Sequence, residues 1–331
     1  MEKDDIFFVK FPKIYENMGE FKAPKNLEWI ATEKIDGSNF SIYSNGKDTK
    51  FAKRTGFLQS DEWFFNYQSI SLELSIKTNK MYEILNSKDQ NIKFIVIYGE
   101  LCGGFYPKDI EKWKGPIPSR INEKGIIIIP LEERAVQEGV YYSDKLKHII
   151  FDIAIINKQN KLKYLEYNEM VKLCQEVDLP YTPILSKGSL QKLLDYSLDF
   201  NSTIPSLFGL KCIENNTAEG IVIRPSIWKD DERPMLKRKN KLFKQYSGNF
   251  DTKNPFLAAT CFINLNRLYG IISKVGAKAD KNEIIKEFKE DVWEALYENK
   301  IIIIDYDKID NFINDKITKM VEEYIEYLNK K

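Results

Sequence analysis

Residues 31–46 read ATEKIDGSNFSIYSNG, and the rest of the chain is best interpreted outward from this stretch. β-type residues lead up to Lys34 and resume after Gly37, a pattern typical of two short strands joined by a turn. The acidic residues Glu33 and Asp36 flank the lysine. A lysine becomes a covalent nucleophile when its pKa is lowered enough to supply free amine at neutral pH. On these residues alone, a surface lysine in a turn before Gly37 is the preferred interpretation.

Further β-type runs, bounded by Gly, Asn or Pro, continue to about residue 243. They occupy residues 91–104, 125–130, 148–156, 161–167 and 217–225. Residues 69–85 and 167–179 instead carry apolar residues at helical spacing. This alternation predicts a mixed α+β domain. A Rossmann fold is excluded, because no glycine-rich loop joins a strand to a helix.

The pattern changes after the polar stretch SGNFDTKNP, residues 247–255. Apolar residues then recur every three or four positions in segments 256–277, 282–299 and 309–329. Pro255 suits the first turn of a helix, and Gly276 suits a helix end. We therefore expect a catalytic domain over residues 1–246 and a small all-α domain over residues 247–331.

Composition limits the classes of function. The chain has 331 residues, 43% of them hydrophobic, which fits a folded protein with a sizeable core. Its 50 Lys and Arg residues nearly balance 49 Asp and Glu residues. A strongly basic, histone-like binder is thereby excluded, and a nucleic-acid site would have to be a local patch.

Histidine and cysteine chemistry are limited as well. His148 is the only histidine, which excludes a histidine triad and a two-histidine metal site. The four cysteines form no C-x-x-C pair, which argues against a zinc ribbon or disulfide framework and favours an intracellular, cytoplasmic protein. We identify no targeting signal and no membrane segment in the sequence.

Two glutamates stand at the ends of apolar runs: Glu100 closes IVIYGE and Glu219 opens EGIVIRP. Carboxylates at strand ends can point into a cleft and hold a hard cation such as Mg²⁺. The plainer alternative for either residue is an ordinary ion pair.

Basic and aromatic candidates complete the set. In MLKRKNK, Lys237 and Lys239 would share one face of a strand and Arg238 the other, so two ammonium groups could meet a polyphosphate. The plainer alternative for so short a charge run is a solvated surface. Arg54 in FAKRTG could bind phosphate or stabilise a turn. Phe151, beside Asp152, could stack on a base or belong to the core.

Taken in order, the motifs EKIDGSN, FAKRTG, YGEL, IIFDI, TAEGIVIRP and MLKRKNK resemble the motif set of the covalent nucleotidyltransferases. Within that superfamily the chain is most similar to the RNA ligase 2 family of ATP-dependent RNA ligases, through AKRTG, TAEGIV and the tail LNRLYGIISKVG. The resemblance implies antiparallel, ATP-grasp-like sheets around a nucleotide cleft, followed by a helical domain that assists engagement of the RNA 5′ end.

The resemblance also implies roles for single residues. Lys34 would attack the α-phosphate of ATP and carry AMP. Glu33 and Phe151 would contact the adenine, and Asn39 and Arg54 would contact the ribose and phosphate. Glu100 and Glu219 would bind the nucleotide and an Mg²⁺ or Mn²⁺ ion. Lys237 and Lys239 would bind the phosphates.

By the same analogy AMP would pass to an RNA 5′-phosphate, and an RNA 3′-hydroxyl would then displace it. We expect a monomer that seals nicks in duplex RNA, in the host cytoplasm if the source is viral. Arg267 and Lys274 are candidates for contact with the RNA backbone.

Two features depart from the bacteriophage enzyme of this family. Asp36 stands where that enzyme has histidine. Residues 105–147 form a longer segment, which is either an insertion that faces the substrate or a folded surface elaboration.

The rival interpretations are a DNA ligase, an mRNA capping guanylyltransferase and a non-catalytic RNA-binding protein of the same fold. The helical pattern after Lys239 counts against the first two, which add a barrel of strands there.

Overall fold

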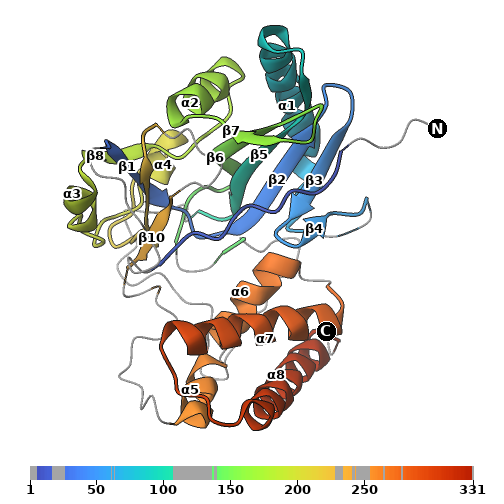
Figure 1. Cartoon of the computed structure of the whole chain (residues 1–331), viewed down its shortest axis with the longest axis vertical. Helices are drawn as coiled ribbons and strands as arrows, with labels where there is room; N and C mark the ends of the chain where they lie inside the picture. Colours follow the sequence, from blue (N-terminus) through green and yellow to red (C-terminus); the bar gives the residue numbers. More distant parts are fainter. Residues whose placement is uncertain are drawn as a thin grey trace. The chain divides into compact units, whose positions relative to one another are not determined.

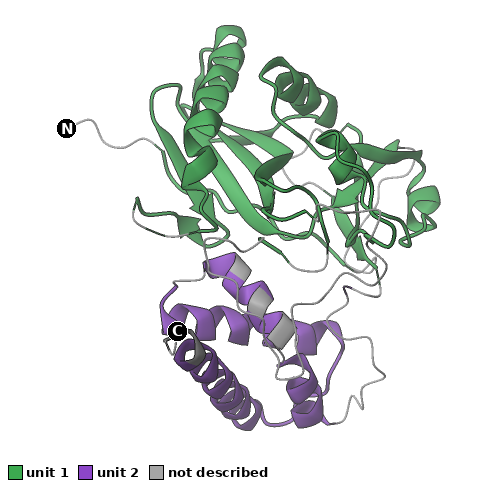
Figure 2. Ribbon diagram, turned by 180° about the vertical axis from the view of Figure 1, so that it is seen from behind, with its two compact units in different colours: residues 1–240 green, residues 241–331 purple. Residues whose placement is uncertain are grey.

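The structure is a computed structural model of the whole chain. It describes residues 6–16, 27–60, 62, 64–106, 136–137, 140–227, 234–240, 243, 254–263, 265–276 and 279–329. The chain divides into two compact units, residues 1–240 and 241–331, which Figure 2 colours separately. The predicted boundary at residues 246/247 lies outside the described residues and stays a prediction.

Unit 1 is built on two antiparallel sheets (Figure 1). In the described residues, the larger sheet has six strands in the order β4-β3-β2-β5-β6-β7. These are β4 (Gly56–Phe57), β3 (Thr49–Lys53), β2 (Ser38–Ser44), β5 (Ile92–Gly103), β6 (Leu146–Asn157) and β7 (Leu162–Tyr164). Antiparallel pairing with short connections agrees with the short β-type runs of the sequence.

The smaller sheet has four strands among the described residues, in the order β10-β9-β1-β8. Its members are β10 (Leu236–Lys239), β9 (Gly220–Pro225), β1 (Trp29–Lys34) and β8 (Ile184–Gly188). The chain crosses from this sheet to the larger one between β1 and β2, so the turn at residues 35–37 joins the two sheets.

Helices cover the outer face of the larger sheet. Helix α1 (Gln68–Lys88) buries Leu74, Thr78, Met81 and Leu85, whose spacing of three and four residues forms one apolar stripe. Helix α2 (Tyr167–Glu176) packs into the same core cluster. The other face of this sheet shares a second cluster with the N-terminal segment and with Val222 and Met235 of the smaller-sheet region.

The smaller sheet buries its own outer face beneath α3 (Leu190–Leu194), with Trp29, Ala31, Ile221 and Ile223 in one cluster. Helix α4 (Ile204–Leu207) follows in the connection to β9. The layer between the sheets is therefore bordered by strands on both sides, and the side chains that end there come from β1, β9 and β10.

Unit 2 is helical in its described residues: α5 (Pro255–Phe262), α6 (Leu265–Val275), α7 (Lys281–Glu298) and α8 (Tyr306–Asn329) surround one apolar cluster. Asn254 caps α5 and Pro255 lies in its first turn. Gly276 follows α6 with a φ of +99°, a backbone conformation that glycine adopts without strain. No helix in the described part of the chain has the length and apolar character needed to span a bilayer.

The α+β prediction is confirmed, as is the exclusion of a Rossmann arrangement. The segment expected as helical over residues 256–277 is two helices, because the chain turns at Ile263, whose backbone is extended. The predicted run 125–130 and most of the 105–147 segment lie outside the described residues.

Candidate active site

Lys34 is the last residue of β1, at the end of the smaller sheet where the chain leaves for the larger one. Its register partner on β9 is Gly220, and Gly220 pairs in turn with Lys239 on β10. Residues in such a row lie on the same face of a sheet, as do residues two positions away, and this places Lys34, Lys237 and Lys239 on one face. The predicted shared face of the two β10 lysines is therefore present in the structure.

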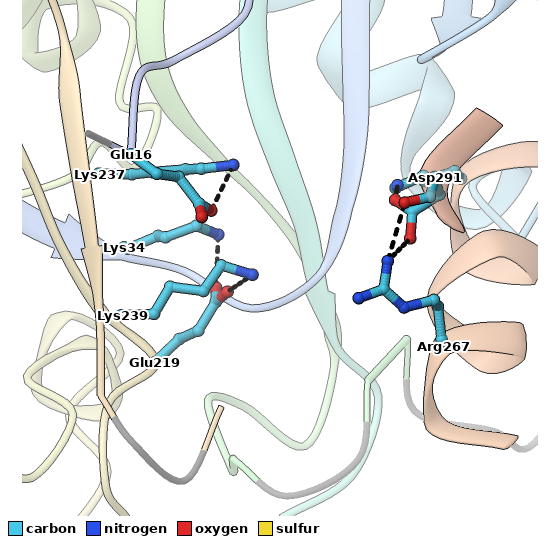
Figure 3. Close-up of polar contacts among 8 residues, drawn as sticks. Glu16, Lys34, Glu219, Lys237, Lys239, Arg267 and Asp291 are labelled. Carbon is cyan, nitrogen blue, oxygen red and sulfur yellow. Dashed lines mark hydrogen bonds and ion pairs between the residues drawn. The ribbon is translucent and has the colours of Figure 1, made fainter. Parts of the chain in front are cut away.

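Glu219 precedes β9 and joins two of these lysines (Figure 3). Its Oε2 accepts from Lys34 Nζ at 2.5 Å, and its Oε1 lies 3.0 Å from Lys239 Nζ. The carboxylate is almost fully buried, whereas the two lysine side chains are 22% and 26% exposed. The nucleophile candidate is thus accessible, and its partner is fixed in the protein.

Gly220 makes this arrangement possible. A Cβ atom at Gly220 would lie 2.0 Å from the carbonyl oxygen of Arg238, and its φ is +154°. The bare backbone lets β10 lie directly against the start of β9, where Asn240 N donates to Glu219 O at 2.8 Å. Glycine therefore holds Lys239 within reach of Glu219.

Gly37 likewise allows the backbone to pack closely, here against Leu101 and Glu100 of β5. A Cβ atom there would lie 2.3 Å from the Leu101 carbonyl oxygen and 2.9 Å from Glu100 Cγ. The turn after Lys34 thus packs directly on β5. Asn39 is the register partner of Glu100 across β2 and β5, so these two candidates are neighbours.

The carboxylates around Lys34 decide its protonation. Burial alone would lower the pKa of the Lys34 amine, but Glu219, Glu100 and Asp36 outweigh burial and raise the pKa to about 12. Burial raises the pKa of Glu100 to about 8, although Lys34 opposes the shift. Burial and the charge of Glu219 also raise the pKa of Asp36. In this state Lys34 is a cation and not yet a nucleophile.

This surplus of carboxylate fits a divalent cation. Glu219, Glu100 and Asp36 lie close enough to affect one another's pKa values, and added positive charge would relieve that repulsion. Within the described residues, no group of three or more His, Cys, Asp or Glu side chains has metal-holding geometry. Magnesium commonly binds one or two carboxylates together with phosphate oxygens and water, so the pair Glu100 and Glu219 is a sufficient protein contribution.

Lys237 has a partner that the sequence did not indicate. Its Nζ lies 2.8 Å from Glu16 Oε1, in the N-terminal segment (Figure 3). Arg238, on the opposite face as predicted, donates to the Tyr196 carbonyl at 3.2 Å. Three lysines and two carboxylates therefore alternate across the end of the smaller sheet.

Glu33 lies on the other face of β1 from Lys34, because consecutive strand residues point to opposite faces. Its carboxylate accepts from Ser202 Oγ at 2.5 Å and from both the backbone N and Oγ1 of Thr203 at 2.8 Å. Burial raises the pKa of Glu33 despite these hydrogen bonds. The structure thus places this carboxylate apart from the Lys34 amine, in a hydrogen-bonded role with Ser202 and Thr203.

A network that sequence reasoning missed fixes the lysine turn. Asp36 N donates to the hydroxyl of Tyr142 at 2.8 Å, and Tyr142 is fully buried. The neighbouring Tyr141 exchanges two backbone hydrogen bonds with the Asn216 side chain, and Asn216 O accepts from Ser202 N. The end of the 105–147 segment is therefore part of the scaffold of the site.

Arg54 interacts with the same centre, whereas Phe151 belongs to an apolar cluster of the larger sheet. Phe151 is partly buried beside Phe11, with ring centroids 5.1 Å apart, in the cluster that includes Val222 of β9. Arg54 follows β3 and lies near enough to Glu100 to lower its pKa. Asp152, next to Phe151, lies 3.4 Å from the guanidinium of Arg224 and links the two sheets.

The two residues proposed for RNA contact belong to a separate cluster in unit 2. Arg267 lies 2.5 Å from the carboxylate of Asp291 (Figure 3). Lys274 lies 2.8 Å from the same carboxylate. Arg267 is nearly buried, and the Lys274 side chain is 42% exposed. Both cations of α6 are thus engaged by α7.

The assembled centre holds Lys34, two further lysines and buried carboxylates at the end of the smaller sheet, where the chain passes to the larger one. This is the composition expected of a nucleotidyl-transfer site, in which positioning and charge matter more than acid–base chemistry. Residues 27–240 match the family described as RNA ligase. The chain therefore belongs to the RNA ligase family, which confirms the resemblance inferred from the motifs.

Curated relatives agree with this family. The chain is 32% identical over 212 residues to RNA-editing ligase 2, mitochondrial, of Trypanosoma brucei brucei, a match covering 60% of this chain and 49% of that protein. It is 32% identical over 216 residues to RNA-editing ligase 1, mitochondrial, covering 60% and 44%. The chain spans about half the length of these relatives.

Solved structures of Naegleria gruberi RNA ligase are also similar to the chain. An apo variant matches with a TM-score of 0.44 and 17% identity, over 72% of this chain and 57% of that one. A variant with ATP and Mn matches with a TM-score of 0.41 and 16% identity, over 66% and 51%.

Proposed function

We propose that this chain is an ATP-dependent RNA ligase that joins an RNA 3′-hydroxyl to an RNA 5′-phosphate through AMP carried on Lys34. Membership in the RNA ligase family supports the class of reaction. The observation that carries the proposal is the position of Lys34, whose side chain is 22% exposed and whose amine is bound to Glu219, with Lys239 on the same carboxylate. A purely binding protein has no need of this set.

In the first step, Lys34 Nζ loses a proton and attacks the α-phosphorus of ATP. A P–N bond forms, the bond from that phosphorus to the bridging oxygen breaks, and pyrophosphate leaves. Because the neighbouring carboxylates raise the pKa of Lys34 to about 12, the amine becomes available only when their charge is neutralised. Lys237 and Lys239 would meet the phosphates as they displace the present carboxylate partners.

Glu100 and Glu219 would hold Mg²⁺ or Mn²⁺ jointly with phosphate oxygens. When bound, this cation would supply positive charge against the negative charge developing on the phosphates. The protein's own part is to keep both carboxylates buried and fixed, through Gly37 and Gly220. Asn39, the register partner of Glu100, and Arg54 would contact the ribose and phosphate, and Phe151 would stack on the adenine.

Two further displacements complete the reaction. An oxygen of the RNA 5′-phosphate attacks the AMP phosphorus and releases the Lys34 amine. The RNA 3′-hydroxyl then loses its proton, attacks the 5′-phosphorus, and AMP leaves. Both are in-line displacements that depend on alignment of the RNA ends.

Unit 2 would assist engagement of the RNA 5′ end, without reading sequence, through exposed basic side chains such as Lys316 and Lys319 of α8. We propose nicked duplex RNA as the preferred substrate and a monomer as the active form. The four cysteines are free thiols, which suits an intracellular, reducing compartment.

The test is incubation of the protein with Mg²⁺ and α-labelled ATP or GTP, followed by denaturing electrophoresis. We expect label from ATP on the wild type and on Lys80→Ala, because Lys80 is an exposed lysine of α1. We expect none on Lys34→Arg, whose guanidinium can still pair with Glu219 but stays protonated. Label from GTP would indicate a capping enzyme, and label from neither would favour the RNA-binding alternative.

Substrate preference needs a second assay. Joining of nicked RNA duplexes, nicked DNA duplexes and free RNA single strands should be compared under the same conditions. Preferential joining of the RNA nick is expected. Preferential joining of DNA, or of free single strands, would contradict that part of the proposal.

A further inference from the structure

The N-terminal segment delivers a carboxylate to the edge of the lysine cluster. Tyr15 N donates to Met235 O at 3.1 Å and Lys237 N donates to Tyr15 O at 2.8 Å, so this residue extends the edge of β10. Glu16 follows at once, and its Oε1 lies 2.8 Å from Lys237 Nζ. The backbone pairing therefore fixes this carboxylate beside Lys237.

The preceding residues of this segment are also fixed by hydrogen bonds and by packing. Val9 O accepts from the hydroxyls of Tyr43 and Tyr98 at 2.9 and 3.0 Å, and Val9 N donates to Tyr43 at 3.1 Å. Phe11 is buried and packs edge-on against Phe151. One segment thus contacts both the candidate adenine-stacking residue and the candidate phosphate-binding lysine.

Glu16 faces more than one lysine. Burial alone would raise its pKa, but Lys237, Lys239 and Lys34 together lower it, so the carboxylate is ionised in their combined field. Its side chain is 36% exposed, which leaves it free to move toward solvent. None of the sequence motifs includes Glu16, which lies before the first motif and more than 200 positions from Lys237.

We propose that Glu16 is a resident anion of the phosphate-binding subsite, which competes with the β- and γ-phosphates for Lys237 and thereby weakens retention of pyrophosphate. This inference rests on the proposed function. A carboxylate and a phosphate oxygen are both acceptors for the same ammonium group, so polyphosphate can bind Lys237 fully only by displacing Glu16. When pyrophosphate forms, the return of Glu16 favours its departure over the reverse reaction.

The test is the affinity of the full chain for inorganic pyrophosphate, measured by calorimetry with Mg²⁺ and without nucleotide. Glu16→Gln should bind pyrophosphate about three- to tenfold more tightly than the wild type, because one opposing charge is removed at a half-exposed site. In the labelling assay, the same variant should be inhibited by correspondingly lower pyrophosphate. Glu16→Asp, which keeps the charge, should stay within about twofold of the wild type.

Glu73→Gln is the matched control, since Glu73 is also a glutamate 2.7 Å from a lysine, Lys77, but lies on the surface of α1. Its pyrophosphate affinity should not change. Misfolding cannot produce tighter binding, so unchanged or weaker binding by Glu16→Gln overturns the inference. Should that variant unfold, Glu16→Ala carries the same test.

Failure of the Glu16 inference can be distinguished from failure of the proposed function. Glu16→Gln without effect, on a protein that still accepts label from ATP at Lys34, would reject the role of Glu16 alone. A wild type that neither accepts label nor binds pyrophosphate would reject the ligase proposal, and the inference with it.

Discussion

Two clusters in this molecule each hold one carboxylate between two cations, and they differ in what surrounds them. In unit 1 the Glu219 carboxylate is held between Lys34 and Lys239, at 2.5 and 3.0 Å. In unit 2 the Asp291 carboxylate is held between Arg267 and Lys274, at 2.5 and 2.8 Å. Judged by distances alone, the two would be assigned the same role.

Their surroundings separate them. Asp291 joins α6 to α7, its pKa is lowered by both cations against the effect of burial, and Arg267 also lies over the Phe262 ring at 5.3 Å. Around Glu219, burial, aided by the charges of Glu219 and Asp36, raises the pKa of Glu100 to about 8, so this carboxyl group has no cation that fully offsets its burial. A cluster whose charges satisfy one another stabilises a fold, whereas one with surplus buried charge is prepared for a ligand.

The largest effect is expected when the carboxylate of the unit 1 cluster is neutralised. Glu219→Gln should reduce adenylylation about 1000-fold, because it removes the charged partner of Lys34 and a proposed ligand for the cation. Initial rates of labelling from α-labelled ATP measure the effect. A rate within tenfold of the wild type would show that Glu219 serves the fold alone.

The second prediction concerns the glycine beside Glu219. Gly220→Ala places a methyl group 2.0 Å from the Arg238 carbonyl oxygen, and the backbone must shift to relieve the contact. We expect a loss of about 3 kcal/mol in the free energy of unfolding, measured in urea. Gly56→Ala, where a Cβ atom meets nothing within 4 Å, is the control and should remain close to the wild type. Equal stability of the two variants would contradict the close packing of β10.

The third prediction concerns Asp291→Asn, which neutralises the carboxylate of the unit 2 cluster. The amide keeps a hydrogen-bond acceptor but no charge, and it leaves the nearly buried Arg267 without a counter-ion at Asp291. We expect a loss of about 2 kcal/mol in the stability of the helical unit and no change in adenylylation. A drop in labelling as large as that of Glu219→Gln would show that the two clusters do not differ in role.

The sequence predicted the centre of the site because its residues lie in short, ordered motifs. Lys34, Glu219 and Lys239 are far apart in the chain, yet the motif order anticipated that they meet. Strand periodicity also anticipated that Lys237 and Lys239 share a face while Arg238 does not. The site roles assigned to these residues stay predictions until the labelling assay is done.

What the sequence did not provide are the partners from outside the motifs. Tyr142 meets Asp36 across 106 positions, and Ser202 meets Glu33 across 169. No local pattern specifies such contacts, because they depend on how the sheets pack. The position of Glu33 could have been predicted, however, because side chains alternate along β1 and Glu33 must therefore lie on the opposite face of the sheet from Lys34.

The cations of unit 2 illustrate the same limit. Arg267 and Lys274 were visible as helix cations, but their partner, Asp291, lies on the next helix, 24 and 17 positions away. Periodicity predicts which face of a helix is apolar and says little about which charge on one helix meets a charge on another.

The smallest predicted effect is a pH dependence of the free energy of unfolding that affects unit 1 and not unit 2. His148, the only histidine, lies in unit 1, where its Nε2 donates to Phe40 O at 3.0 Å and a Cβ atom at Gly99 would clash with its ring. Burial lowers its pKa from 6.5 to about 4. The unfolded chain therefore takes up a proton near pH 6.5, while the folded chain resists protonation until about pH 4.

Histidine's contribution to stability is thus fully present above pH 6.5 and is lost as the pH falls toward 4. Between pH 6.5 and 5 the loss should be about 1.5 kcal/mol for the wild type relative to His148→Gln, whose side chain does not titrate. The buried Glu100, with its raised pKa, has the opposite dependence, so only the difference between the two proteins isolates the histidine. Urea unfolding at both pH values, followed separately for each unit, measures it. An equal pH dependence of the two proteins would mean that His148 is not held neutral by the sheet, and a difference confined to the helical unit would place the effect outside unit 1.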